Sequence, residues 1–155
     1  MFLNFKDCGI KKMKTKLTIS IVVYKGYGDA FNAVESIEKY TSREICKKIY
    51  VVDNSMYEDD YSAKQDFISQ ITQYDDVVYI DTKQNLGFGK GHNYILDTIE
   101  SEYHAIVNPD IILKEDAFDE LLKFMDNDDT IGMCIPKLVD EKGEMQLAYR
   151  KYPTV

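Results

Sequence analysis

The chain has 155 residues, the usual length of one domain, and its 45% of hydrophobic residues gives it enough apolar surface to bury in a core. Its formal charge is −8. An excess of acid opposes the phosphate neutralisation on which nucleic-acid binding depends, so the composition argues against both disorder and nucleic acid as a partner.

Residues 1–16 form a basic arm ahead of the first long apolar run. Its five lysines are Lys6, Lys11, Lys12, Lys14 and Lys16. A basic arm can touch anionic lipid, but this one lacks a sustained amphipathic period, and we favour a solvated tail. The sequence has no signal-peptide core, no run of about 18 apolar residues and no Cys-x-x-Cys pair. We therefore expect a cytoplasmic protein, with the inner face of the cell membrane as an alternative location.

Short apolar runs alternate with segments of helical period over 17–155. Runs rich in β-branched residues predict strands over 17–24, 48–53, 77–80 and 104–107. Apolar residues at helical spacing predict helices over 29–40, over 61–74, from the loop after the third strand to about 101, and over 114–125. Asp29 is expected near the N-cap of the first of these helices. An apolar stretch over 131–138 and a hairpin turn over 140–143 follow. The alternation predicts an α/β fold with a mostly parallel sheet, helices on both faces, and ligands beyond the carboxyl ends of the strands.

Polar residues gather at those carboxyl ends. Tyr24 follows the first strand, Asp53 and Asn54 follow the second, and 85–93 and 108–110 follow the third and fourth. A carboxylate at the position of Asp53 can accept hydrogen bonds from a base N–H or a ribose hydroxyl. It can equally form an Asx turn, and the residue alone does not decide between the two.

The segment 85–91 reads Asn-Leu-Gly-Phe-Gly-Lys-Gly. The alternating glycines, Gly87, Gly89 and Gly91, allow a close approach to phosphate or positive φ angles, but they also suit a tight loop that enters a helix. Their spacing matches neither the dinucleotide fingerprint nor a Walker loop. His92, the next residue, can donate to a phosphate or pack at the helix start, and we favour packing.

Asn108-Pro109-Asp110 follows the fourth strand. Asp110 offers a hard oxygen to Mg²⁺ or Mn²⁺, and one carboxylate suffices if phosphates and waters complete the octahedron. An ordinary turn explains the same three residues. The sequence pairs no nucleophile with a base, so a hydrolase ranks low.

Four motifs together resemble inverting family 2 glycosyltransferases of the GT-A (Rossmann-like) fold, and in particular their rhamnosyltransferase-like branch. The motifs are Ser20-Ile21-Val22-Val23-Tyr24, Val51-Val52-Asp53-Asn54-Ser55, Asn85-Leu86-Gly87-Phe88-Gly89-Lys90-Gly91-His92-Asn93 and Asn108-Pro109-Asp110. They occur in order, and the resemblance runs from about Leu17 to Val155, including the segment 146–153.

The resemblance implies that residues 17–155 form the nucleotide-sugar-binding part of such an enzyme. It places the donor nucleotide on Val23, Tyr24, Asp53, Asn54, Asn85, Gly87, Phe88, Gly89, Gly91, Asn93 and Asn108. It assigns the divalent metal, Mg²⁺ or Mn²⁺, to Asp110, while Asn108 replaces the first acid of the usual Asp-x-Asp and Lys25 stands where the family often has Asn.

The implied reaction is the transfer of a sugar, with inversion, from a UDP- or dTDP-linked donor to a saccharide or lipid-linked saccharide, in cell-surface polysaccharide synthesis. The resemblance places the general base beyond Val155. We therefore expect a truncated chain that binds the donor and transfers sugar poorly or not at all. Two alternatives remain: a nucleotidyltransferase-like module, and a non-catalytic nucleotide-binding or scaffold module.

Overall fold

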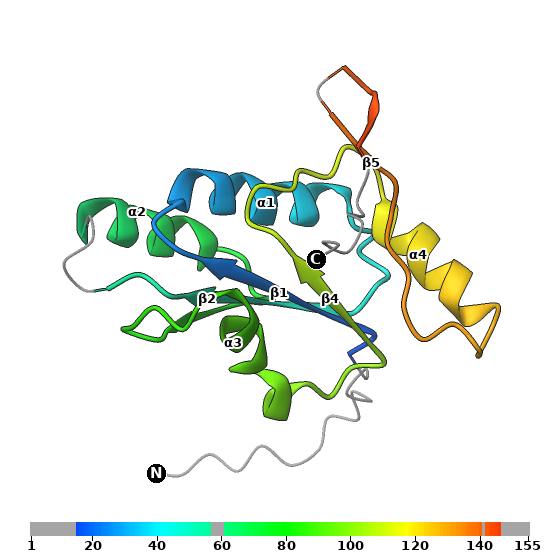
Figure 1. Cartoon of the computed structure of the whole chain (residues 1–155), viewed down its shortest axis with the longest axis horizontal. Coiled ribbons are helices and arrows are strands. Elements are labelled where there is room, and N and C mark those ends of the chain that lie inside the picture. Colours follow the sequence, from blue (N-terminus) through cyan, green and yellow to red (C-terminus); the bar gives the residue numbers. More distant parts are fainter. Residues whose placement is uncertain (1–14, 57–60, 141, 147–155) are drawn as a thin grey trace, which may run out of the picture.

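The computed structural model of the chain describes residues 15–56, 61–140 and 142–146. Its central sheet has four parallel strands in the order β3-β2-β1-β4 (Figure 1). These strands are β1 (Leu17–Val23), β2 (Lys47–Asp53), β3 (Val77–Asp81) and β4 (Tyr103–Val107). Val23 pairs with Asp53, and Asp53 pairs with Asp81, so the carboxyl ends of β1, β2 and β3 lie at one edge of the sheet. The parallel α/β sheet predicted from the sequence is confirmed.

The strand β1 lies at the centre of the molecule, and all seven of its residues are buried. It lies between β2 and β4, and side chains pack against both of its faces. Alternate residues of a strand point to opposite faces. Ile19, Ile21 and Val23 belong to the larger core. Val22 belongs to a smaller core on the other face, together with Tyr50, Val52 and Ile95.

Helices cover both faces of the sheet, as the sequence predicts (Figure 1). On one face lie α1 (Tyr27–Tyr40) and α2 (Tyr61–Ile71). On the other lie α3 (Phe88–Asn93) and the short 3₁₀ turn η1 (Leu96–Thr98). The residues of α1 and α2 that face the sheet complete the larger core, and Ile95, between α3 and η1, completes the smaller one.

The helix α4 (Ala117–Asp126) begins three residues later than predicted. Asp116 explains the later start, because its Oδ1 accepts a hydrogen bond from the backbone N–H of Asp119 at 3.0 Å and caps the helix. Phe118 and Leu122, one turn apart, extend the larger core. None of the helices in the described part of the chain is long and apolar enough to cross a membrane.

Other helix boundaries also differ from the predictions. The helix α2 ends at Ile71, three residues earlier than predicted. The helix α1 begins at Tyr27 after the N-cap residue Gly26, so Asp29 lies in its first turn. The single helix predicted after the glycine loop is divided into α3, which has six residues, and η1; glycines such as Gly89 and Gly91 favour helix weakly.

The predicted hairpin near the end of the chain is confirmed. The strands β5 (Leu138–Val139) and β6 (Met145–Gln146) pair antiparallel, and Gly143 supplies the positive φ of 83° in the turn. No regular element covers 131–137. Residues 1–14 of the basic arm and most of the segment 146–153 lie outside the described residues.

Candidate functional site

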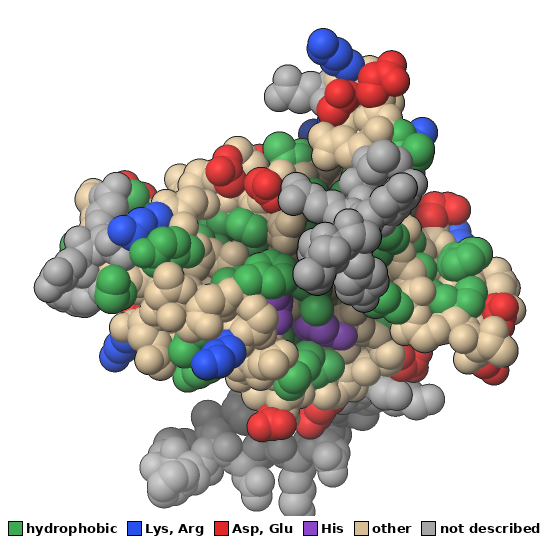
Figure 2. Space-filling view, in the orientation of Figure 1, with side chains coloured by type: hydrophobic (Ala, Val, Ile, Leu, Met, Phe, Trp, Pro, Cys, Tyr) green, Lys and Arg blue, Asp and Glu red, His purple; other side chains and the backbone are tan. Residues whose placement is uncertain are grey.

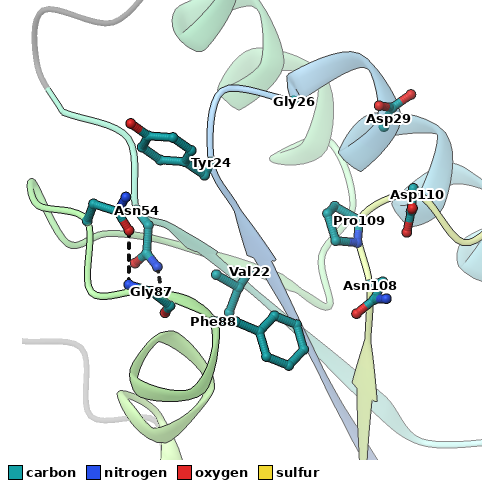
Figure 3. A pocket seen from close by; sticks show the side chains of 11 residues that line it. Val22, Tyr24, Gly26, Asp29, Asn54, Gly87, Phe88, Asn108, Pro109 and Asp110 are labelled. Atoms are coloured by element: carbon teal, nitrogen blue, oxygen red, sulfur yellow. Dashed lines mark hydrogen bonds between the residues drawn. The ribbon is translucent and has the colours of Figure 1, made fainter. Parts of the chain in front are cut away.

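A pocket of about 580 Å³ opens at the carboxyl edge of the sheet (Figure 3). It is lined by Val22, Tyr24, Gly26, Asp29, Asn54, Asn85, Gly87, Phe88, Asn108, Pro109 and Asp110. The ends of β1, β2 and β4, the start of α1 and the glycine loop therefore contribute to one cavity. Its volume falls in the range of about 300–1,000 Å³ that is usual for small-molecule sites.

The end of β1 contributes an aromatic wall. Tyr24 is 45% exposed and lines the pocket, and the Lys25 ammonium lies 5.3 Å from the centre of its ring. Lys25 adopts a φ of 63° and donates its backbone N–H to the Ser55 hydroxyl at 2.9 Å, which ties the loop after β1 to the end of β2. Val23 is fully buried in the larger core, and the strand alternation turns Val22 toward the pocket instead.

Asp53 is fully buried and does not line the pocket. Its Oδ1 accepts the backbone N–H of Ser55 at 2.8 Å. Its Oδ2 accepts the hydroxyls of Tyr79 at 2.6 Å and Tyr27 at 3.1 Å, and lies 3.2 Å from the Lys64 ammonium. Both carboxylate oxygens are thus engaged by the protein itself.

Two groups that contact Asp53, the Tyr79 hydroxyl and the Lys64 ammonium, stay protonated. Burial and the hydrogen bond to Asp53 raise the pKa of Tyr79 far above its usual value, so its hydroxyl stays protonated and donates. Burial lowers the pKa of Lys64, but its hydrogen bonds to Asp81 and Asp53 outweigh that effect and leave the pKa above its usual value. The Lys64 ammonium lies 3.1 Å from Asp81, so one buried cation joins the ends of β2 and β3.

Asn54 holds the glycine loop against β2. Its Nδ2 donates to the carbonyl of Gly87 at 3.0 Å, and its Oδ1 accepts the Thr82 hydroxyl at 3.2 Å. Asn85 accepts the backbone N–H of Gly87 at 2.9 Å, so Gly87 is bonded on both sides (Figure 3). The Asn54 side chain is 1% exposed, and like Asp53 it shapes the pocket wall more than it offers a free polar group.

The three glycines of the loop have different structural roles. Gly87 adopts φ 74° and ψ 173°, a region that is essentially restricted to glycine. A Cβ on Gly91 would lie 2.8 Å from a Val22 methyl and 3.0 Å from the Asn54 amide, so a side chain there would push α3 off the sheet. Gly89 has neither constraint: its φ is ordinary, and no atom of the described chain meets a Cβ built there within 4 Å.

His92 packs beneath the loop and does not line the pocket. It is 3% exposed, and its Nδ1 lies 2.8 Å from the Ser20 hydroxyl, which in turn lies 3.0 Å from Nε2 of His104. The two histidines lie together among hydrophobic side chains (Figure 2). Burial lowers the pKa of His92 to about 4, so the ring is neutral at pH 7. Asn93, at the end of α3, is exposed and also lies outside the pocket lining.

The end of β4 contributes oxygen atoms to the pocket lining. Asn108 and Asp110 line the pocket, and Asp29 from the first turn of α1 lines it as well (Figure 3). Carboxylate and amide oxygens are the donors that Mg²⁺ and Mn²⁺ prefer. Within the described ranges no cluster of three or more His, Cys, Asp or Glu side chains is placed to hold a metal ion. The donor atoms of Asp29, Asn108 and Asp110 are of the kind that suits a hard divalent cation.

Sequence reasoning missed several residues that form or support the pocket. Asp29 was read only as a capping residue, and Val22 and Val23 were not assigned to opposite faces. Lys64 carries a visible signal, because it stands three residues before Phe67 and seven before Ile71, on the apolar stripe of α2. A lysine on an apolar stripe predicts a buried acidic partner.

Comparisons with known proteins agree with this architecture. The family model described as Glycosyl transferase family 2 matches residues 18–154. A search of curated proteins gave no match. S. aureus TarS 1–349 in complex with UDP superimposes with a TM-score of 0.59 at 16% identity, over 79% of this chain and 38% of that chain. The mannosyltransferase PcManGT from Pyrobaculum calidifontis, in complex with GDP-Man and Mn²⁺, gives a TM-score of 0.55 at 16% identity, over 72% of this chain and 31% of that chain.

At these identities the structural likeness shows a shared fold, and the chain spans less than two fifths of the length of either structure. The family match is broader, because it extends over nearly the whole of the chain. The parallel sheet, with its helices on both faces, is a GT-A-like α/β fold that is shared with those two structures. The chain belongs to glycosyl transferase family 2.

Proposed function

We propose that this chain binds the nucleoside-diphosphate-sugar donor of an inverting glycosyltransferase. The observation that carries the proposal is the pocket itself: one cavity of about 580 Å³ has an exposed aromatic ring, Tyr24, at one end and oxygen donors, Asn108 and Asp110, at the other (Figure 3). A nucleotide sugar has the matching order of groups, with a base at one end and a diphosphate bonded to a sugar at the other.

In this arrangement the base stacks on Tyr24, which is 45% exposed and is held beside the pocket by the bond from Lys25 to Ser55. The glycine loop passes along the ligand at Gly87, and Asp110 faces the diphosphate. When bound there, Mg²⁺ or Mn²⁺ supplies a Lewis acid that neutralises the charge developing on the departing nucleoside diphosphate. Asp53 and Asn54 contribute indirectly, because their hydrogen bonds hold the wall of the pocket in place.

The nature of the donor is supported by the structural neighbours. TarS is described in complex with UDP and with UDP-GlcNAc, and PcManGT in complex with GDP-Man and Mn²⁺. We propose a UDP- or dTDP-linked donor, hexosyl or rhamnosyl transfer, and a saccharide or lipid-linked saccharide acceptor in cell-surface polysaccharide synthesis at the cytoplasmic face of the membrane. Transfer also needs a general base that removes the proton of the acceptor hydroxyl.

Calorimetric titration of the chain with UDP, dTDP and GDP, each with and without Mn²⁺, tests the proposal. We expect one nucleotide to bind more tightly with Mn²⁺ than without it, and Asp110→Asn to abolish that gain, at least about tenfold in Kd, because it removes the charged ligand. The matched control is Asp97→Asn, an exposed aspartate of η1 outside the pocket, which should leave both affinities unchanged. Absence of binding by all three nucleotides would contradict the proposal and favour a scaffold.

A further inference from the structure

Phe88 is the second exposed aromatic ring of the pocket. It is 54% exposed and lines the cavity together with Tyr24. The two rings lie at different ends: Tyr24 stands near Asn54, whereas the ring of Phe88 extends across the floor beside Val22, on the side where Asn108 lies (Figure 3). A large apolar ring held open to water inside a cavity is a candidate contact for a ligand.

The ring of Phe88 is held in place by the ring of His92, four residues later in the chain. The His92 ring packs against it with centroids 4.4 Å apart and planes at 73°, an edge-to-face contact. His92 is fixed in turn by the Ser20 hydroxyl at 2.8 Å, Ser20 contacts His104 at 3.0 Å, and His104 contacts Thr18 at 2.8 Å. These bonds anchor the support of Phe88 to the centre of β1. The exposed ring is therefore positioned before any ligand arrives.

The proposed function places the sugar at this end of the pocket. The diphosphate faces Asp110, and the sugar is bonded to the phosphate farther from the nucleoside, so it lies on the Asn108 side. A pyranose ring presents C–H bonds with partial positive charge on its faces, and the face of an aromatic ring is negative. Asp29, which also lines the pocket, offers a carboxylate to sugar hydroxyls.

We propose that Phe88 is the platform on which the donor sugar stacks, and hence a residue that makes the pocket prefer a nucleotide sugar over the free nucleotide. The inference rests on the proposed function, because it takes the base to Tyr24 and the diphosphate to Asp110. The inference gives the two aromatic rings different roles. Tyr24 contacts every ligand that carries the base, whereas Phe88 contacts only ligands that carry the sugar.

The test compares UDP with UDP-GlcNAc, and GDP with GDP-Man, by calorimetry in the presence of Mn²⁺. The variants are Phe88→Ala, which removes the ring, and Phe88→Leu, which keeps apolar bulk without an aromatic face. We expect both variants to weaken binding of the nucleotide sugar that the wild-type chain prefers, Phe88→Ala by about tenfold, and to change the Kd of the free nucleotide by less than about twofold. Tyr24→Leu, the matched control, should weaken both ligands equally.

Three results would overturn the inference. Equal losses for nucleotide and nucleotide sugar in Phe88→Leu would make Phe88 a contact of the base or the diphosphate. Unchanged affinities in Phe88→Ala would remove it from the site. Each of these two results leaves the proposed function intact, provided that the wild-type chain binds a nucleotide with Mn²⁺. Failure of the wild-type chain to bind any of the four ligands, together with failure to bind dTDP, would overturn the proposed function as well.

Discussion

Asp53 ends the buried strand β2 and Asn54 follows it, at positions that the family resemblance assigns to the donor nucleotide. Their side chains are nevertheless bonded to other groups of the protein. Asp53 accepts Ser55 N–H with one oxygen and Tyr79, Tyr27 and Lys64 with the other. The sequence alone left two interpretations of Asp53 open, a ligand or a local turn. The local turn is present, because Asp53 accepts the Ser55 N–H. Its other partners, on α1, α2 and β3, are distant in sequence, so the pattern around Asp53 does not show that its carboxylate also joins these elements.

Replacing Asp53 tests this structural role. Asp53→Asn leaves an N–H₂ group facing other donors and removes one of the two carboxylates that neutralise Lys64. We expect the free energy of unfolding to fall by about 3 kcal/mol in urea titration. Asp119→Asn, which removes an i,i+4 partner of Lys123 at the surface, should change it by about 0.5 kcal/mol or less. If Asp53→Asn unfolds like this control but loses nucleotide affinity, Asp53 is a ligand.

The glycine loop and α3, between the third and fourth strands, depend on individual glycines for different reasons. The loop was predicted to contact phosphate or to be a tight entry into a helix. The structure gives Gly87 a conformation reserved for glycine and Gly91 a close contact with Val22. A pattern of alternating glycines indicates that backbone freedom or space is needed. It cannot indicate which glycine needs which, since that depends on the packing of α3 against β1.

Three alanine variants separate these roles. Gly87→Ala forces a side chain into the glycine-only region and should lower the free energy of unfolding by about 1–3 kcal/mol. Gly91→Ala overpacks against Val22 and Asn54, with a similar expected loss of about 1–3 kcal/mol. Gly89→Ala should raise it by about 0.5–1 kcal/mol, because alanine favours helix and meets open space. Chemical denaturation measures all three. A loss at Gly89 equal to that at Gly87 would mean that the loop has another backbone path.

At the scale of the whole molecule, the parallel sheet brings the ends of β1, β2 and β4 to one cavity. This part was readable from sequence, because short buried strands that alternate with helices leave few topologies, and ligands of such sheets gather at the carboxyl edge. Tyr24, Asn85 and Asp110 follow three of the predicted strands, and for that reason all three line the pocket. Asp29 was missed because the position of the first turn of α1 beside the cavity depends on the path of the loop after β1.

The measurement that tests the central claim most directly is paramagnetic broadening of backbone amide signals when Mn²⁺ is added with the preferred nucleotide, with Mg²⁺ as the diamagnetic control. The account predicts the strongest broadening at Asp29, Asn108 and Asp110, around one cation in the pocket, and a dependence on nucleotide. It also predicts that the acidic turn 126–129 keeps its signal intensity. Strongest broadening at that turn, or broadening that is the same without nucleotide, would contradict a donor site at this edge of the sheet.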